Sequence, residues 1–192
     1  MRRHLPILLL TAACHGTGAS ATFNGTVRGQ SMTPSASISA PATVSFASGM
    51  APVAAILLSD ASALCTLFGL NEQAKSSRSL LLFLADVNAS TGAIEVPPGT
   101  ASFSVFAVGS GAPPAHFAVA SFGVDDASCQ RIPSQSATAV SGTILLTGNS
   151  GGAYQGTYDL TFDSGDHVTG SFDTAVCHAV TTFLASDLHS CG

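Results

Sequence analysis

The segment 148–152, which reads Gly-Asn-Ser-Gly-Gly, is the first candidate for chemistry because it fits the G-x-S-x-G pattern around nucleophilic serines. Such a serine needs a histidine base and an acid that orients the base. The nearest preceding histidine, His116, lies just 34 residues before Ser150, and residues 154–162 alternate like a strand rather than a helix. We therefore interpret the segment as a loop and assign no catalytic residue. An exported hydrolase that uses Ser150 is the alternative.

Carboxylates and histidines also gather near the C-terminus. Strand patterns over 154–162 and 168–173 predict a hairpin whose polar face carries Asp159, Asp163 and Asp173, and such oxygens suit Ca²⁺. Their spacing does not follow the calcium-loop pattern D-x-[DN]-x-[DN]-G, and His167 and His178 lack an evident third ligand for zinc. The sequence favours a solvated face with no metal or cofactor assigned. A calcium-binding β-domain built on the three carboxylates is the alternative.

The elements that position these residues are tied together by cysteines. Four of them lie in the body of the chain, at Cys65, Cys129, Cys177 and Cys191. No C-x-x-C pair occurs, which argues against a zinc ribbon or a thioredoxin-like redox site. An even number of cysteines in an exported chain predicts two disulfides in an oxidising compartment, and all three pairings are open.

The N-terminus has the three regions of a secretory leader: a basic start, an apolar run over 5–10, and small residues that end at Cys14. We predict a signal peptide over 1–13, a lipid on Cys14 that anchors the protein to a membrane, and a flexible tether over 14–21. The rival is cleavage after Ala21, at an A-x-A site, which gives a secreted or periplasmic soluble protein. The apolar run is too short to span a bilayer.

Charge excludes some partners. Only 9% of the 192 residues are charged. Without the leader, four basic residues remain against eleven acidic ones, a net charge of −7. Nucleic-acid binding rests on clustered basic residues, so no nucleic-acid partner is expected.

Short alternating segments separated by Gly, Pro, Asn and Ser predict an all-β fold. Besides a first strand from residue 22, candidates cover 42–46, 53–59, 80–87, 101–108, 116–124, 137–147, 154–162 and 168–173. One short helix is expected within 61–75, with Ser59 or Asp60 as its N-cap and Cys65 on it. The prediction is a single antiparallel β-domain over 22–192 with about nine strands, arranged as a sandwich or a partly closed barrel.

Several segments resemble uncharacterised bacterial cell-envelope lipoproteins: Gly-Thr-Val-x-Gly at 25–29, Ile-Leu-Leu-Ser-Asp at 56–60 followed by Cys65, the strand 141–147, and the segments 156–162 and 168–173 followed by Cys177. The position of Cys14 also resembles a lipobox, although Thr11 stands where that motif prefers an aliphatic residue. The resemblance implies an envelope location and a β-fold without an assigned activity. We therefore expect a lipid-anchored or secreted envelope protein, a non-catalytic binding or surface-structural module whose ligand or protein partner is unknown.

Overall fold

The computed structural model describes residues 19–46, 49–97, 99–107, 111–186 and 188–192. The predicted signal peptide and Cys14 lie outside the described residues. Within them the fold is all-β, as predicted, with thirteen strands and two short helices where about nine strands and one helix were expected. The excess consists of four strands of two residues each, which are too short to produce an alternation in the sequence.

The helices and strands have the following bounds. The strands are β1 (Ser20–Gly25), β2 (Ala36–Phe46), β3 (Gly49–Ser59), β4 (Glu72–Gln73), β5 (Arg78–Val87), β6 (Ile94–Glu95), β7 (Ser102–Val105), β8 (His116–Val124), β9 (Ala137–Ser150), β10 (Ala153–Phe162), β11 (His167–Asp173), β12 (Ala175–Val176) and β13 (Ser190–Cys191). The helices are α1 (Leu64–Gly69) and α2 (Ala179–Leu184), and a 3-10 turn covers Pro133–Gln135.

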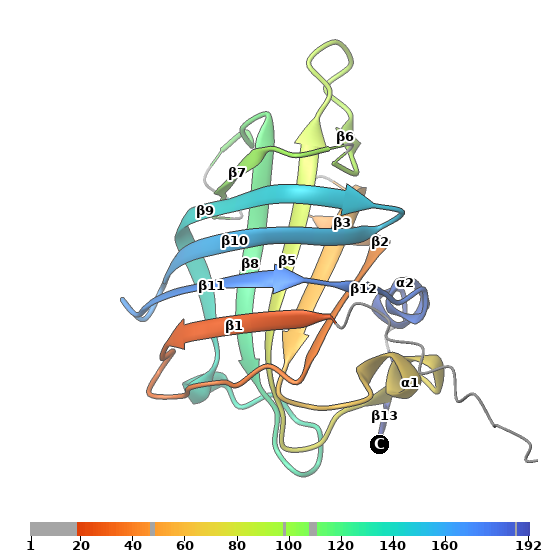
Figure 1. Cartoon of the computed structure of the whole chain (residues 1–192), viewed down its shortest axis with the longest axis vertical. Helices are drawn as coiled ribbons and strands as arrows, with labels where there is room; N and C mark the ends of the chain where they lie inside the picture. The colour runs from red at the N-terminus through yellow and green to blue at the C-terminus, as the bar shows by residue number, and fades with distance from the viewer. Residues whose placement is uncertain (1–18, 47–48, 98, 108–110, 187) are drawn as a thin grey trace, which may run out of the picture.

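One large sheet holds almost all of these strands, in the order β1-β11-β10-β9-β7-β8-β5-β3-β2-β12, with β6 beside β5. Figure 1 shows that the sheet curls over, so that β9, β10, β11 and β1 cross in front of β8, β5, β3 and β2. The result is a half-barrel, which favours the partly closed barrel over a sandwich of two separate sheets. Neighbours in this sheet are antiparallel apart from the short pairs β7–β8 and β12–β2.

The curl depends on β9, which belongs to both layers. Its first residues pair with β8, and its remainder pairs with β7 and β10. Gly142, in the middle of β9, has a φ of 134°, and a side chain there would meet the Asp159 carbonyl at 2.2 Å. The register between β9 and β10 shifts close by, between Thr161 and Phe162. A glycine beside a bulge lets the strand bend where the sheet changes direction.

The side chains of the sheet form two apolar cores. The first fills the interior of the half-barrel, where Phe103, Phe122, Tyr154 and Phe162 are almost completely buried. The second lies on the outer face of β2, β3 and β5, beneath α1 and α2. Strands buried on both faces read as continuous apolar runs, which explains the run of leucines at 80–82.

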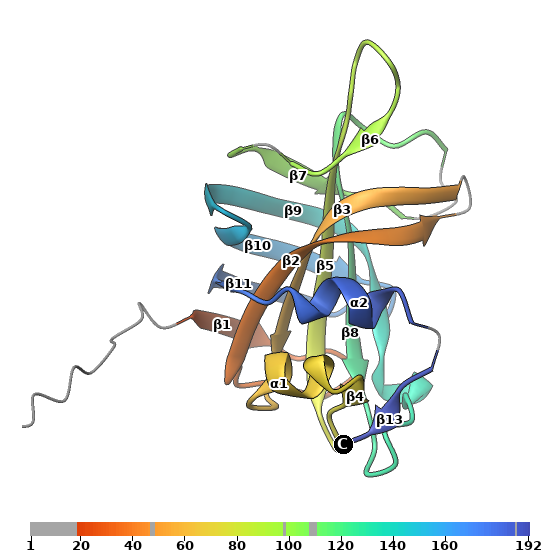
Figure 2. The ribbon, with the colours of Figure 1, turned by 90° about the vertical axis from the view of Figure 1, so that its right-hand side faces the viewer.

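Two disulfides fix the second layer, as the even cysteine count predicted. Cys65 in α1 is bonded to Cys177 before α2, and Cys129 after β8 is bonded to Cys191 in β13. They indicate an oxidising compartment outside the cytoplasm. Figure 2 shows α1, α2 and β13 together on one side of the molecule. We call these three elements the helical cover.

The helices differ from the prediction in length, number and capping. α1 covers six residues and begins after Ala63, which has a φ of 57° and no side-chain cap. Ser59 instead accepts a hydrogen bond from the N–H of Ala61, and Asp60 binds Arg78. Neither helix in the described part of the chain is long and apolar enough to cross a membrane.

Candidate functional site

A cavity of about 280 Å³ lies between the helical cover and the outer face of the sheet. Its floor consists of side chains that point outward from three adjacent strands. In register they form two rows, one of Ser59, Ser79 and Gly123, and one of Leu57, Leu81 and Ser121. The cavity therefore has a polar row at one end and a more apolar row beside it.

The polar end is organised by an ion pair. Arg131 follows the turn after β8, and the isolated bridge between Asp125 and Arg131 brings the two residues side by side. Arg131 Nε lies 2.9 Å from Asp125 Oδ1, and Arg131 Nη2 donates to Asp125 Oδ2 at 3.4 Å. Both oxygens of the carboxylate are thus engaged by one guanidinium.

The guanidinium lies on the sheet in place of a missing side chain. A Cβ atom built on Gly123 would lie 1.1 Å from Arg131 Nη1 and 2.1 Å from Cζ. Nη1 has no hydrogen-bond acceptor in the part of the chain that the structure describes. The side chain of Arg131 is 50% exposed and that of Asp125 is 16% exposed. The polar end therefore reaches solvent through Arg131 and presents free N–H donors.

Burial raises the pKa of the Asp125 carboxyl, and this effect outweighs the attraction and hydrogen bond of Arg131, which lower it. The neighbouring Asp126 carboxylate also raises the pKa by repulsion. Burial thus disfavours the ionised form of Asp125, while Arg131 favours it. The ion pair is a partly buried element of the cavity wall.

Serine hydroxyls complete the polar end. Ser59 donates to the Arg78 carbonyl at 2.7 Å, and Ser77 donates to the Ala74 carbonyl at 3.1 Å. Ser79 and Ser121 are half-buried and have no side-chain partner among the described residues. Two hydroxyl groups beside Arg131 are therefore available to a bound molecule.

The apolar end lies under the two helices. Phe68 of α1 stacks on Phe183 of α2 with ring centroids 4.0 Å apart. His189 also stacks on Phe183, with ring centroids 3.9 Å apart. Leu64 and Val180 are buried in the same layer and also line the cavity. The wall here is aromatic and aliphatic, which suits an apolar group.

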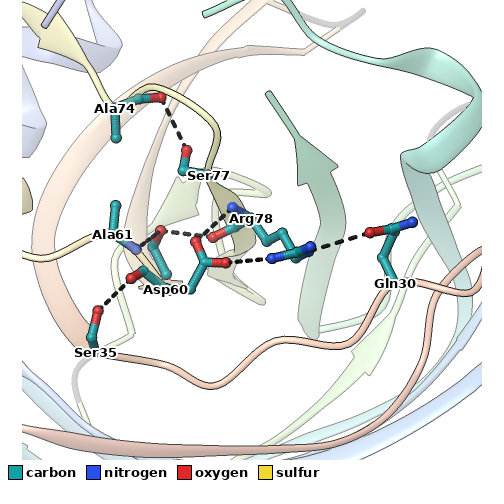
Figure 3. Close-up of polar contacts among 8 residues, drawn as sticks. Gln30, Ser35, Asp60, Ala61, Ala74, Ser77 and Arg78 are labelled. Carbon is teal, nitrogen blue, oxygen red and sulfur yellow. Dashed lines mark hydrogen bonds and ion pairs between the residues drawn. The ribbon is translucent and has the colours of Figure 1, made fainter. Parts of the chain in front are cut away.

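A polar network supports the cavity at the lower end of β3 and β5, as Figure 3 shows. Asp60 accepts the N–H of Arg78 at 2.7 Å and also contacts Arg78 Nη1 at 3.0 Å. Arg78 Nε donates to Gln30 at 3.3 Å, while Ser35 donates to the Asp60 carbonyl at 2.6 Å. These contacts tie the loop before β2 to the ends of β3 and β5. Asp60 and Arg78 satisfy each other and hold the floor in place.

The residues singled out in the sequence lie elsewhere. Ser150 is exposed at the end of β9, in the hairpin that leads to β10, and no described histidine is hydrogen-bonded to it. His116 instead contacts Asp86 at 2.8 Å. The described residues thus do not assemble a serine-histidine-acid triad around Ser150.

The three carboxylates of the predicted polar face have separate partners. Asp159 contacts His167 at 2.7 Å, Asp163 contacts Arg28 at 3.5 Å, and Asp173 accepts from Gln155 at 3.1 Å. Asp173 is in register with Gln155, and Gln155 precedes Asp159 by four residues in β10. Asp173 and Asp159 are therefore separated by roughly 13 Å along the strand direction. Within the described ranges no three His, Cys, Asp or Glu side chains are placed to hold a metal ion.

Sequence reasoning missed the cavity and its ion pair. Asp126, the neighbour of Asp125, stabilises the turn after β8 by accepting the N–H groups of Ser128 and Gln130. The available signal was a basic residue six positions after an acidic one, across a turn that contains a cysteine. No known protein family matches the chain, and no curated protein or solved structure is similar to it.

Proposed function

We propose that this protein is an exported, lipid-anchored binding protein that holds a small, largely apolar molecule in the cavity beneath its helical cover. The cavity itself carries the proposal. It combines an apolar wall with a few unpaired donors, which is the usual composition of small-molecule sites. The interior of the half-barrel is filled with aromatic and aliphatic side chains, so the space for a ligand lies outside the barrel.

The covalent structure around the cavity supports a binding role. The bond between Cys65 and Cys177 joins the two helices, and the bond between Cys129 and Cys191 joins the turn before Arg131 to the C-terminal strand. Both walls of the cavity are therefore held in place before a ligand arrives. A preformed site lowers the ordering cost of binding.

The start of the first strand supports processing at Cys14. Ser20 and Ala21 belong to β1 and are in register with Asp173 and Phe172 of β11. Ala21 also packs against the interior core. Cleavage after Ala21 would remove these two residues from the sheet, whereas cleavage before Cys14 leaves β1 complete. A lipid on Cys14 would hold the protein at the bacterial envelope.

Binding is tested with a tryptophan reporter, since the chain contains no tryptophan. Leu184→Trp puts one at the cavity wall, in a Cys14→Ser background that keeps the chain free of lipid. Titration with 1-octanol is expected to change the emission saturably. Ser121→Phe, which fills the floor, should abolish the change, while Ser104→Phe on the exposed face of β7 should not. A response that survives Ser121→Phe contradicts the proposal.

The anchor is tested by the intact mass of the protein purified from a bacterial membrane. A mass that begins at Cys14 and carries a diacylglycerol or three acyl chains supports the anchor. A mass that begins at Thr22 overturns it.

A further inference from the structure

We propose that the ligand of this cavity is a small monocarboxylate whose carboxylate binds Arg131 and whose hydrocarbon part lies beneath α1 and α2. This inference rests on the proposed function and adds the chemistry of the ligand. It follows from three features: the unused donors of Arg131, the direction of the polar gradient, and the size of the space.

The donors favour a carboxylate. A guanidinium has five N–H groups, and Asp125 engages those on Nε and one on Nη2. The two N–H groups of Nη1 and the second on Nη2 are left over. A carboxylate offers two oxygens to such a fork, and the hydroxyls of Ser79 and Ser121 are further donors on the same floor.

The change from a polar to an apolar end of the cavity sets the orientation of the ligand. Arg131 is half-exposed at one end, whereas Leu64 and Val180 are buried at the other. A carboxylate at Arg131 keeps part of its contact with water, while the hydrocarbon part leaves water entirely. The opposite orientation would bury a charge among phenylalanine rings, at a large desolvation cost.

The volume of the cavity limits the length of the ligand. The 280 Å³ cavity lies just below the usual range of small-molecule sites, about 300–1,000 Å³, so it suits a ligand of about the size of octanoate. A long-chain fatty acid exceeds this space, and acetate would leave the apolar end empty. Medium-chain or aromatic monocarboxylates fit it.

The charge of the occupant is restricted by Asp125. Both of its oxygens already engage Arg131, so an ammonium group could share them only by lying beside the guanidinium. A cation at the same position would face the Arg131 guanidinium. We therefore expect octylamine to bind less tightly than octanoate.

The test compares octanoate, 1-octanol and octylamine in the Leu184→Trp, Cys14→Ser protein at neutral pH. Octanoate should bind at least about tenfold more tightly than 1-octanol, as expected for a charge-assisted hydrogen bond. Arg131→Gln should bring the two affinities to within about twofold, while the affinity for 1-octanol stays the same. The matched control is Arg28→Gln, because Arg28 is a partly exposed arginine that pairs with Asp163, and neither residue lines the cavity.

The outcomes separate the two proposals. Equal affinities for octanoate and 1-octanol in the parent protein, or the same loss in Arg28→Gln as in Arg131→Gln, overturn the carboxylate and leave the binding function standing. No response to any of the three ligands overturns the binding function itself. If Arg131→Gln does not fold, Ser79→Ala provides the second variant, with octanoate expected to weaken and 1-octanol to bind unchanged.

Discussion

The guanidinium of Arg131 occupies the place where residue 123 would carry a side chain. Gly123 lies on the outer face of β8, in register with Ser79, and a Cβ atom there would overlap Arg131 Nη1. The glycine and the arginine are eight residues apart and on opposite sides of the turn that contains Cys129. The absence of a side chain at one position thus allows the charge of the other to lie flat on the sheet and to pair with Asp125.

Gly123→Ala is expected to push the guanidinium away from β8 and to weaken its pairing with Asp125. The free energy of unfolding should fall by about 1 kcal/mol, because Asp125 is partly buried while Arg131 is half exposed and solvent screens their attraction. Urea denaturation measures the change. Gly148→Ala is the matched control, since the nearest atom to its new methyl group is the end of the flexible Gln155 side chain at 3.1 Å. A similar loss in both variants would contradict the role of position 123.

The raised pKa of Asp125 predicts a pH-dependent effect of Asp125→Asn. A carboxyl whose pKa is higher in the folded protein than its unfolded value of about 3.9 stabilises the fold fully below that pH, and the contribution is lost as the pH rises through the folded pKa. The unfolding free energy of Asp125→Asn minus that of the parent should therefore increase between pH 3.5 and 6.5. Urea denaturation at both pH values tests this. The pKa of Asp166 is lowered by hydrogen bonds from Ser164 and the Arg28 N–H, but Asp166 is present in both proteins and cancels.

The two tyrosines of β10 provide a matched pair for a buried hydrogen bond. The Tyr158 hydroxyl donates to the carbonyl of Thr22 in β1 at 2.7 Å, across the intervening strand β11. The Tyr154 hydroxyl has no partner among the described residues. Tyr158→Phe should lower the unfolding free energy by about 1 kcal/mol, while Tyr154→Phe should change it by less than about 0.5 kcal/mol. Equal effects would mean that the bond to Thr22 does not hold β1.

Strands with one buried face and one solvent-exposed face could be predicted from the sequence. Along β10 and β11, Tyr158 and Leu160 alternate with threonines and Asp159, and the structure has the predicted hairpin. The half-barrel was harder to predict, because its curl depends on the bend near Gly142, which alternation alone does not reveal. The disulfides were predictable in number, whereas their pairing follows from how α1 and β13 are placed on the sheet.

The cavity was not predictable for a related reason. α2 has six residues, among them β-branched Val180, Thr181 and Thr182, and such a segment has little helix propensity of its own. Val180 and Phe183 pack on the sheet, and this tertiary contact stabilises the helix. Without α2 the helical cover is incomplete, and Arg131 and Ser121 would then be surface residues outside any cavity.

Removing each disulfide should affect the cover differently. The double variants Cys65→Ser/Cys177→Ser and Cys129→Ser/Cys191→Ser are each expected to lose about 2–5 kcal/mol of stability, because each bond closes a long loop. Hydrogen exchange distinguishes them. The amides of α2 should lose protection in the first variant and largely keep it in the second, since only the first bond joins α1 to the segment that leads into α2. Equal exchange in both would contradict this division.

The first two residues of β1 allow a test that is independent of any lipid. A chain that begins at Ala19 keeps Ser20 and Ala21 in register with β11, whereas a chain that begins at Thr22 lacks them and exposes the end of that strand. The shorter chain should be less stable by roughly 1–2 kcal/mol, from lost backbone hydrogen bonds and from the contact of Ala21 with the interior core. Urea denaturation of the two chains measures the difference. Equal stability would remove the structural argument against cleavage after Ala21, because the protein would then lose nothing when β1 is shortened.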